Sequence, residues 1–166
     1  MRILFTGGGT AGHVTPNIAL IKRLLAEGWQ VDYVGSKTGI ERELIAGVPG
    51  VTYHAISSGK LRRYFSWQNF ADPFRIVRGV FEARRLIRAC KPDVIFSKGG
   101  YVSVPVVVAA GKTPVVAHES DFSPGLANRI AARYADRVCV TFADTARHIS
   151  GGRAVHTGTA IRPEPG

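Results

Sequence analysis

A glycine-rich turn followed directly by a histidine is the first place where the residue types suggest chemistry. Residues 3–16 read ILFTGGGTAGHVTP, and Gly7, Gly9 and Gly12 fit the pattern G-x-G-x-x-G. Glycines let the backbone turn sharply and approach a ligand, and the helix that follows offers free N–H groups to an anion. His13 would lie at the positive end of that helix, which favours a neutral imidazole. Such an imidazole beside a phosphate can act as a general base, or it can simply hydrogen-bond the turn.

The same glycine pattern occurs in loops that bind nicotinamide dinucleotides, and those loops need a further acidic residue. That acid should end the second strand, about 20 residues on, and bind a ribose hydroxyl. Asp32 has roughly this spacing, but Tyr33 and Val34 follow it and place it in the middle of the strand. The strand ends on segment 35–37, which contains no acid. We therefore expect the turn to bind an anion other than a nicotinamide dinucleotide.

A second glycine turn carries its own positive charge. In segment 97–105, SKGGYVSVP, the residues Lys98, Gly99 and Gly100 lie between a predicted strand and a predicted helix. Two such turns at one sheet edge favour a ligand with a diphosphate or two anionic ligands, and two unrelated tight turns are the alternative. Segment 118–129, HESDFSPGLANR, then ends another strand on a His-Glu pair. Glu119 could orient or deprotonate a hydroxyl, or cap a neighbouring helix.

The segments that must position these residues alternate between short apolar strands and helical patterns. Strands are expected at 2–6, 29–35, 51–56, 93–97, 113–118, 137–142 and 153–159. Helices are expected to begin at Thr15-Pro16 and Asp72-Pro73, where a capping residue precedes proline, and near residues 102 and 124. This alternation predicts an α/β fold with a doubly wound, mostly parallel, Rossmann-like sheet of about seven strands. Ligands of such sheets bind at the carboxyl ends of the strands, where both glycine turns and Glu119 are expected.

Composition and charge narrow the classes of partner. The chain has 166 residues, 45% of them hydrophobic, which is enough for one domain with a core. Its net charge of +10 favours an anionic partner, such as a phosphorylated substrate or a membrane surface. No recognised nucleic-acid motif and no repeated basic–aromatic platform is present, so a nucleic-acid partner is not expected. The two cysteines and five histidines lack metal-ligand spacing, so we expect neither a metal nor another cofactor.

A basic segment with a hydrophobic stripe could contact a membrane. In the helix expected from residue 72 to about 89, Phe74, Val77 and Phe81 recur at spacings of three and four and therefore share one face. The basic residues beside this stripe include Arg75, Arg78 and Arg85. Such a face suits an anionic membrane surface, although a hydrophobic stripe usually belongs to the core, and one helix can do both. The start of the chain lacks the pattern of a signal peptide and the longest apolar run is too short to span a bilayer, so we expect a cytoplasmic protein.

Six segments in order resemble the MurG family of peptidoglycan glycosyltransferases. They are TGGGTAGHVTP, GSKTGIERE, SGKLRRY, KPDVIFSKGGYVSVP, HESDFSPGLANRIAARYAD and TGTAIRPE, and together they cover essentially the whole chain. The similarity is to the N-terminal half of these enzymes, which have the two-domain GT-B fold and belong to glycosyltransferase family 28. It implies transfer of N-acetylglucosamine from UDP-N-acetylglucosamine (UDP-GlcNAc) to undecaprenyl-diphosphate-MurNAc-pentapeptide, lipid I, to give lipid II. No metal is implied, and the implied location is the inner face of the cell membrane.

The resemblance also implies roles for individual residues. His13 matches the candidate base for the acceptor hydroxyl, and Arg162 matches a donor-binding arginine. Tyr101 and Glu119 match positions tied to acceptor binding or activity. The residues expected to bind substrate are Thr10, Ala11, Gly12, Gly99, Gly100, Tyr101, Asp121, Asn128 and Arg162. In the family, the N-terminal domain mainly takes the lipid acceptor and the C-terminal domain mainly holds UDP-GlcNAc. A patch similar to the one on residues 74–85 is thought to dock on the anionic membrane.

Two positions depart from the common family pattern, and the end of the sequence sets a further expectation. Asp121 stands where an amide usually lies, and Val104 replaces a common glycine. A related glycosyltransferase with another lipid acceptor is therefore one alternative. We expect an acceptor domain over residues 1–162 and the start of a linker over 163–166, with the donor domain outside this chain, so that the chain alone has little or no turnover. The other alternative is a non-catalytic, membrane-docked subunit that binds the acceptor.

Overall fold

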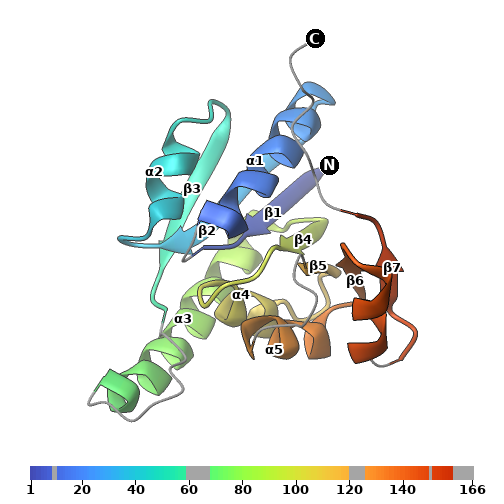
Figure 1. Cartoon of the computed structure of the whole chain (residues 1–166). Helices are drawn as coiled ribbons and strands as arrows, with labels where there is room; N and C mark the ends of the chain where they lie inside the picture. The colour runs from blue at the N-terminus through green and yellow to red at the C-terminus, as the bar shows by residue number, and fades with distance from the viewer. Residues whose placement is uncertain (9–10, 59–67, 120–125, 150, 159–166) are drawn as a thin grey trace.

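A seven-stranded parallel sheet forms the centre of the molecule (Figure 1). The computed structural model describes residues 1–166 except 9–10, 59–67, 120–125, 150 and 159–166. Its strands are β1 (Arg2–Thr6), β2 (Gln30–Ser36), β3 (Val51–Ile56), β4 (Val94–Ser97), β5 (Val115–Glu119), β6 (Arg137–Val140) and β7 (Ala154–His156). Its helices are α1 (Ala11–Ala26), α2 (Ile40–Ala46), α3 (Gln68–Cys90), α4 (Ser103–Ala109) and α5 (Leu126–Tyr134), with a 3-10 helix η1 (Ala143–His148). The predicted fold class, α/β with about seven parallel strands, is confirmed.

The order of the strands brings the two glycine turns next to each other. It is β3-β2-β1-β4-β5-β6-β7, so the chain first builds outward from β1 and then returns to add β4 on the other side of β1. In the register of the sheet, Thr6 at the end of β1 pairs with Val34 of β2 and with Ser97 of β4. The point where the direction of winding changes is where ligands bind in open α/β sheets. Here that point lies between the turns that follow Thr6 and Ser97.

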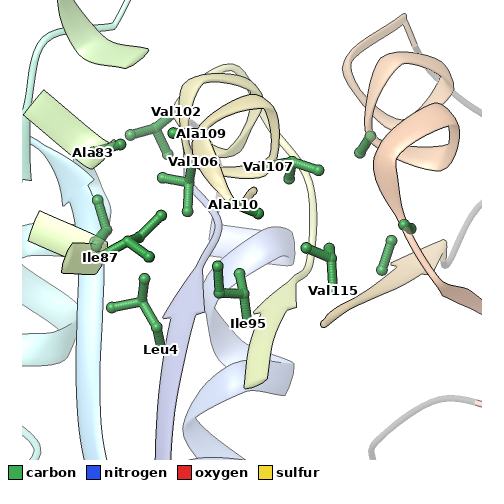
Figure 2. Close-up of a cluster of buried hydrophobic side chains, with 14 of the residues drawn as sticks. Leu4, Ala83, Ile87, Ile95, Val102, Val106, Val107, Ala109, Ala110 and Val115 are labelled. Carbon is green, nitrogen blue, oxygen red and sulfur yellow. The ribbon is translucent and has the colours of Figure 1, made fainter. Parts of the chain in front are cut away.

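Two hydrophobic cores hold the helices on opposite faces of the sheet. Leu4 and Ile95 point to the face covered by α3, α4 and α5, and Figure 2 shows them beneath Val106 of α4. The alternate residues of β1 point to the other face, where α1 and α2 pack. Because successive side chains of a strand point to opposite faces, strands covered on both sides must be apolar at nearly every position. This explains the short continuous apolar runs in the sequence.

The predicted starts of two helices are wrong. α1 begins at Ala11 and contains Pro16, and α3 begins at Gln68 and contains Pro73, so neither proline opens its helix. In both helices proline is the sixth residue and removes one early hydrogen bond, after which the ladder continues. In α1 the first turn packs against the core through Val14, which is fully buried, and this burial favours a helix that starts before Pro16. The short helix α2 and the 3-10 helix η1 were not predicted.

Candidate functional site

The two glycine turns pack directly against each other at the carboxyl edge of the sheet. The N–H of Gly8 donates to the carbonyl of Gly99 at 3.2 Å, and the N–H of Lys98 donates to the carbonyl of Thr6 at 2.9 Å. Gly100 has φ of +87°, and a Cβ at this position would overlap the carbonyl oxygen of Gly8. The backbone of one turn therefore touches the backbone of the other, and this is possible only without side chains. The expectation that both turns share one edge of the sheet is confirmed.

The first turn of α1 follows the first glycine turn. Ala11 and Gly12 are exposed at the start of the helix, and His13 is its third residue. The first N–H groups of a helix have no partner within the helix, so they are available to an anion. The strand end beneath them is fixed by Tyr33, whose hydroxyl donates to the carbonyl of Gly7 at 2.6 Å. The free N–H groups at the start of α1 are therefore available to an anion that binds beside the two glycine turns.

A buried carboxylate lies next to the second glycine turn. Glu119 ends β5 and is 3% exposed, and the Nδ2 group of Asn128 on α5 donates to its Oε2 at 2.6 Å. The amide of Asn128 also lies where a Cβ on Gly99 would be. Three residues predicted to bind substrate or to act on it, Gly99, Glu119 and Asn128, are thus brought together. Tyr101 follows the same turn and is partly exposed.

Lys98 and His118 are buried at this edge, and neither was predicted to bind substrate. Lys98 is 1% exposed and His118 is 7% exposed. The Nε2 of His118 lies 3.0 Å from the carbonyl of Gly158, so this nitrogen carries the proton and donates it. Burial lowers the pKa of His118 below its ordinary value, and the nearby charge of Lys98 lowers it further, against the opposing effects of Gly158 and Glu119. A neutral His118 therefore ties the end of β5 to the segment after β7.

The lowered pKa of His118 predicts that the chain loses stability on mild acidification. The unfolded chain binds a proton at this histidine below about pH 6.5, whereas the folded chain resists binding it, so the free energy of unfolding falls as the pH falls through this range. We expect His118→Gln, which keeps a donor for Gly158, to reduce this slope by at most about 1.4 kcal/mol per pH unit. Urea unfolding of both proteins at pH 7.5, 6.5 and 5.5 measures the difference. Equal slopes would contradict the prediction.

A second buried carboxylate, Glu41 at the start of α2, supports the first glycine turn from the side of β2. It is 1% exposed, and its Oε1 accepts the N–H of Ser36 at 2.8 Å. A Cβ on Gly8 would lie 2.6 Å from the carboxylate carbon of Glu41. A Cβ on Gly35 or Gly39 would come at least as close to the Glu41 side chain. Segment 35–43 resembled the family at the sequence level, but no role was predicted for Glu41. A glutamate in a polar segment gives no sign that it will be buried, and Glu43 in the same segment is exposed.

Removing this carboxylate should destabilise the chain measurably. Glu41→Ala leaves the half-buried N–H of Ser36 without its acceptor and opens a cavity beside Gly8, so we expect a loss of about 2–3 kcal/mol in the free energy of unfolding. Glu43→Ala is the matched control, because Glu43 belongs to the same first turn of α2 and is exposed. Urea unfolding measures both variants. Equal small losses would show that Glu41 has no special role in holding the turn.

Several predicted residues do not belong to this edge, or cannot be placed there. Thr10, Asp121 and Arg162 lie outside the described residues, and of His13 only the backbone is described. The predicted membrane-contacting residues are on α3 rather than at the glycine turns. Phe74, Val77 and Phe81 are 79%, 55% and 69% exposed. The opposite face of α3, including Gly79, Ala83 and Ile87, is buried, so the stripe is left outside the core.

Asp32, which was considered as a ribose ligand, is occupied elsewhere. Its carboxylate accepts hydrogen bonds from Arg2 at 2.7 Å and pairs with His54 at 2.9 Å. Burial raises the pKa of Asp32, but these bonds outweigh it and hold the pKa below its ordinary value. Cys90 lies beside the pair, within 4.8 Å, so three metal-ligand residue types meet despite their unpromising spacing. Arg2 already supplies the positive charge here, and we interpret the cluster as an Arg2–Asp32 ion pair with a hydrogen bond to His54, which together join β1, β2 and β3.

Comparison with known proteins gives one family and close relatives. The model of the glycosyltransferase family 28 N-terminal domain matches residues 3–140. The chain is 57% identical over 165 residues to UDP-N-acetylglucosamine--N-acetylmuramyl-(pentapeptide) pyrophosphoryl-undecaprenol N-acetylglucosamine transferase of Clostridium botulinum, and 53% identical to the protein of that name in Geobacillus thermodenitrificans. Each match covers 98% of this chain and 46% of the relative, so the chain spans about half the length of these curated relatives. The crystal structure of Acinetobacter baumannii MurG is similar with a TM-score of 0.80 and 29% identity, covering 98% of this chain and 46% of that one.

Proposed function

The chain belongs to glycosyltransferase family 28, matching its N-terminal domain, and from this we propose that it is the acceptor-binding half of a sugar transferase. The reaction we propose is transfer of N-acetylglucosamine from UDP-GlcNAc to undecaprenyl-diphosphate-MurNAc-pentapeptide, which converts lipid I into lipid II. Support comes from the relatives, whose name describes this transfer. A second domain, which would correspond to the part of those relatives that this chain does not cover, would hold most of UDP-GlcNAc.

The observation that carries the proposal is the contact between the two glycine turns. The hydrogen bond from Gly8 to Gly99 holds two glycine backbones, both open to close approach by a ligand, at the point where the winding of the sheet changes direction. This point lies beside the start of α1. Such an edge favours binding of a diphosphate, because the diphosphate can accept hydrogen bonds from free N–H groups and its negative charge is stabilised by the helix dipole. The proposed acceptor carries a diphosphate, and so does the proposed donor.

The chemistry requires a base for the acceptor hydroxyl. As that oxygen bonds to the anomeric carbon of the donor sugar, the bond to UDP breaks, UDP leaves with the electron pair, and the hydroxyl proton must go to a base. We propose His13 for this role. Glu119, held by Asn128, would orient the acceptor beside the second turn. The residues that would bind the acceptor and the diphosphates are Thr10, Ala11, Gly12, Gly99, Gly100 and Tyr101. Asp121 would lie near the donor sugar, and Arg162 would reach the donor.

Transfer of labelled N-acetylglucosamine to a short-chain lipid I analogue tests the proposal. The chain is assayed alone, mixed with the C-terminal half of the C. botulinum relative, and fused to that half at the end of the matched region; we refer to this last protein as the fused enzyme. Activity of the mixture or the fused enzyme, with little from the chain alone, is the expected result. Activity with other lipid-linked sugars but not with lipid I would favour a related transferase. A chain that binds the lipid I analogue while both combinations stay inactive would favour a non-catalytic acceptor-binding subunit.

We further propose that α3 docks this domain on an anionic membrane surface, where a lipid-linked acceptor would be found. Within the described part of the chain, no helix is both long and apolar enough to cross a bilayer. The exposed stripe of Phe74, Val77 and Phe81 could enter the interface while its basic neighbours meet lipid phosphates. Those neighbours are Arg75, Arg78 and Arg85, all exposed. Figure 1 shows the first half of α3 extending beyond the sheet, where it is open to such a surface.

Vesicle binding checks this surface. We expect Phe74→Ser with Phe81→Ser to weaken binding to anionic vesicles at least about tenfold, because each ring loses its burial in the interface. Tyr134→Ser removes an exposed aromatic residue from α5 and should leave binding unchanged. Binding of the unaltered chain should also weaken as salt is raised. Equal binding to neutral vesicles, or no effect of the double substitution, would overturn the membrane assignment.

A further inference from the structure

A cavity of about 320 Å³ lies beside the glycine turns, between α5 and η1. Its apolar lining consists of Ala117, Ala132, Val138 and Ile149. It is continuous with the candidate site, because it is also lined by Asn128, whose amide lies beside Gly99, and by Glu119, which accepts a hydrogen bond from Asn128. A ligand that extends from the turns along α5 would therefore enter this cavity. None of the roles discussed above uses its far end, where α5 faces η1.

The groups around the far end are basic. Arg129 and Arg133 lie one helical turn apart on α5, and Arg153 reaches in from the segment before β7. Arg153 is anchored, since its Nη1 donates to the carbonyl of Ala135 at 2.7 Å. In the described part of the chain, no salt bridge engages Arg129 or Arg133. Three guanidinium groups thus line a cavity whose only acidic lining residue, among those described, is Glu119.

The combination of lining and charge selects a class of ligand. Guanidinium groups bind carboxylates and phosphates through paired hydrogen bonds. A bare phosphate gains nothing from contact with the four apolar residues, and it fills only a small part of a cavity of about 320 Å³. A short peptide end fits both features, because its small apolar side chains can cover the floor while its terminal carboxylate meets the arginines. The name of the relatives describes a sugar acceptor that carries a pentapeptide. In that name, muramyl denotes an acyl group, which forms an amide bond with the amino end of the peptide. The carboxyl end of the peptide is therefore free.

We propose that the cavity between α5 and η1 binds the carboxylate end of the peptide on the acceptor, through Arg129, Arg133 and Arg153. The proposal rests on the proposed function, because that function supplies the acceptor. It makes the cavity a specificity site for the acceptor: the diphosphate binds at the glycine turns and the peptide extends along α5. Removing arginines should then weaken acceptor binding without slowing the chemical step.

The first test compares two acceptors in the fused enzyme. One is a short-chain lipid I analogue with a free terminal carboxylate, and the other is its terminal amide. For Arg129→Gln with Arg133→Gln we expect KM for the carboxylate acceptor to rise about tenfold with kcat unchanged, as expected for the loss of charge-assisted hydrogen bonds. KM for the amide should be the same with and without the substitutions. Arg23→Gln, which changes an exposed arginine of α1, is the matched control and should alter neither value. Equal effects on both acceptors, or no effect on either, would overturn the proposal.

A second test does not depend on transfer and separates this proposal from the proposed function. The chain is titrated with free N-acetylmuramyl-pentapeptide, with its terminal amide, and with inorganic pyrophosphate, while the side-chain N–H signals of the arginines are followed by NMR. Signals of Arg129, Arg133 and Arg153 should shift with the acid and stay in place with the amide. No shift with the acid, or the same shifts with pyrophosphate alone, would overturn the proposal even in an active enzyme. If these signals shift as expected while the fused enzyme transfers to neither acceptor, the proposed function fails and the binding site stands.

Discussion

Gly100→Ala is expected to abolish detectable transfer by the fused enzyme and to lower the free energy of unfolding of the chain by roughly 2–4 kcal/mol. Two causes add. The residue has φ of +87°, a backbone conformation that costs an L-residue with a Cβ roughly 1–2 kcal/mol. The new Cβ would also overlap the carbonyl oxygen of Gly8, and no side-chain rotation can relieve an overlap with backbone. The two turns must separate, which breaks the hydrogen bond from Gly8 to Gly99.

Gly28→Ala separates these two causes. Gly28 lies just after α1 with the same φ of +87°, and nothing lies within 4 Å of a Cβ placed there. This control should therefore show only the conformational cost, roughly 1–2 kcal/mol, and should keep its transfer activity. Urea unfolding gives the stability of both variants, and the lipid I analogue assay gives their activity. If Gly100→Ala costs no more than Gly28→Ala and remains active, the contact between the turns is not what builds the site.

The strands were easier to predict than the helices, for a physical reason. A strand covered on both faces must be apolar at nearly every position, so segment 2–6, expected as a strand, matches the buried strand β1 residue for residue. Helix starts depend on packing that is distant in sequence. Pro16 and Pro73 gave strong local start signals, yet each lies inside its helix. α2 has only seven residues, too few for a helical period to stand out from its polar surroundings.

For the candidate site, local backbone requirements could be predicted and buried polar contacts could not. The glycine turns were recognisable because few conformations other than a turn or a close approach call for clustered glycines. Glu119 and Asn128 were found, but their hydrogen bond joins β5 to α5 and leaves no mark in the spacing. Glu41 was missed as part of the site, and no role was predicted for His118, because both roles come from burial. A charged residue in a polar segment is usually exposed, and only the folded structure places Glu41 beside Gly8.

His13→Ala in the fused enzyme is expected to lower kcat by about 10²–10⁴-fold, the usual contribution of a positioned general base. His13 is the third residue of α1, so its backbone belongs to the turn that starts beside both glycine turns. The positive end of a helix favours a neutral imidazole, which is the form that can accept the proton of an acceptor hydroxyl. The substitution removes that acceptor without touching α3. Binding to anionic vesicles should therefore stay as it is in the unaltered protein.

The pattern of rescue distinguishes a base from a structural residue. Added imidazole should restore part of the lost kcat in His13→Ala, because it supplies a proton acceptor to the space left by the side chain. It should have no effect on Gly100→Ala, where the fault is in the backbone. His156→Ala is the control, since His156 is exposed on β7 and should tolerate the change. Full activity of His13→Ala would exclude it as the base, and the buried carboxylate of Glu119 would become the next group to test, by Glu119→Gln.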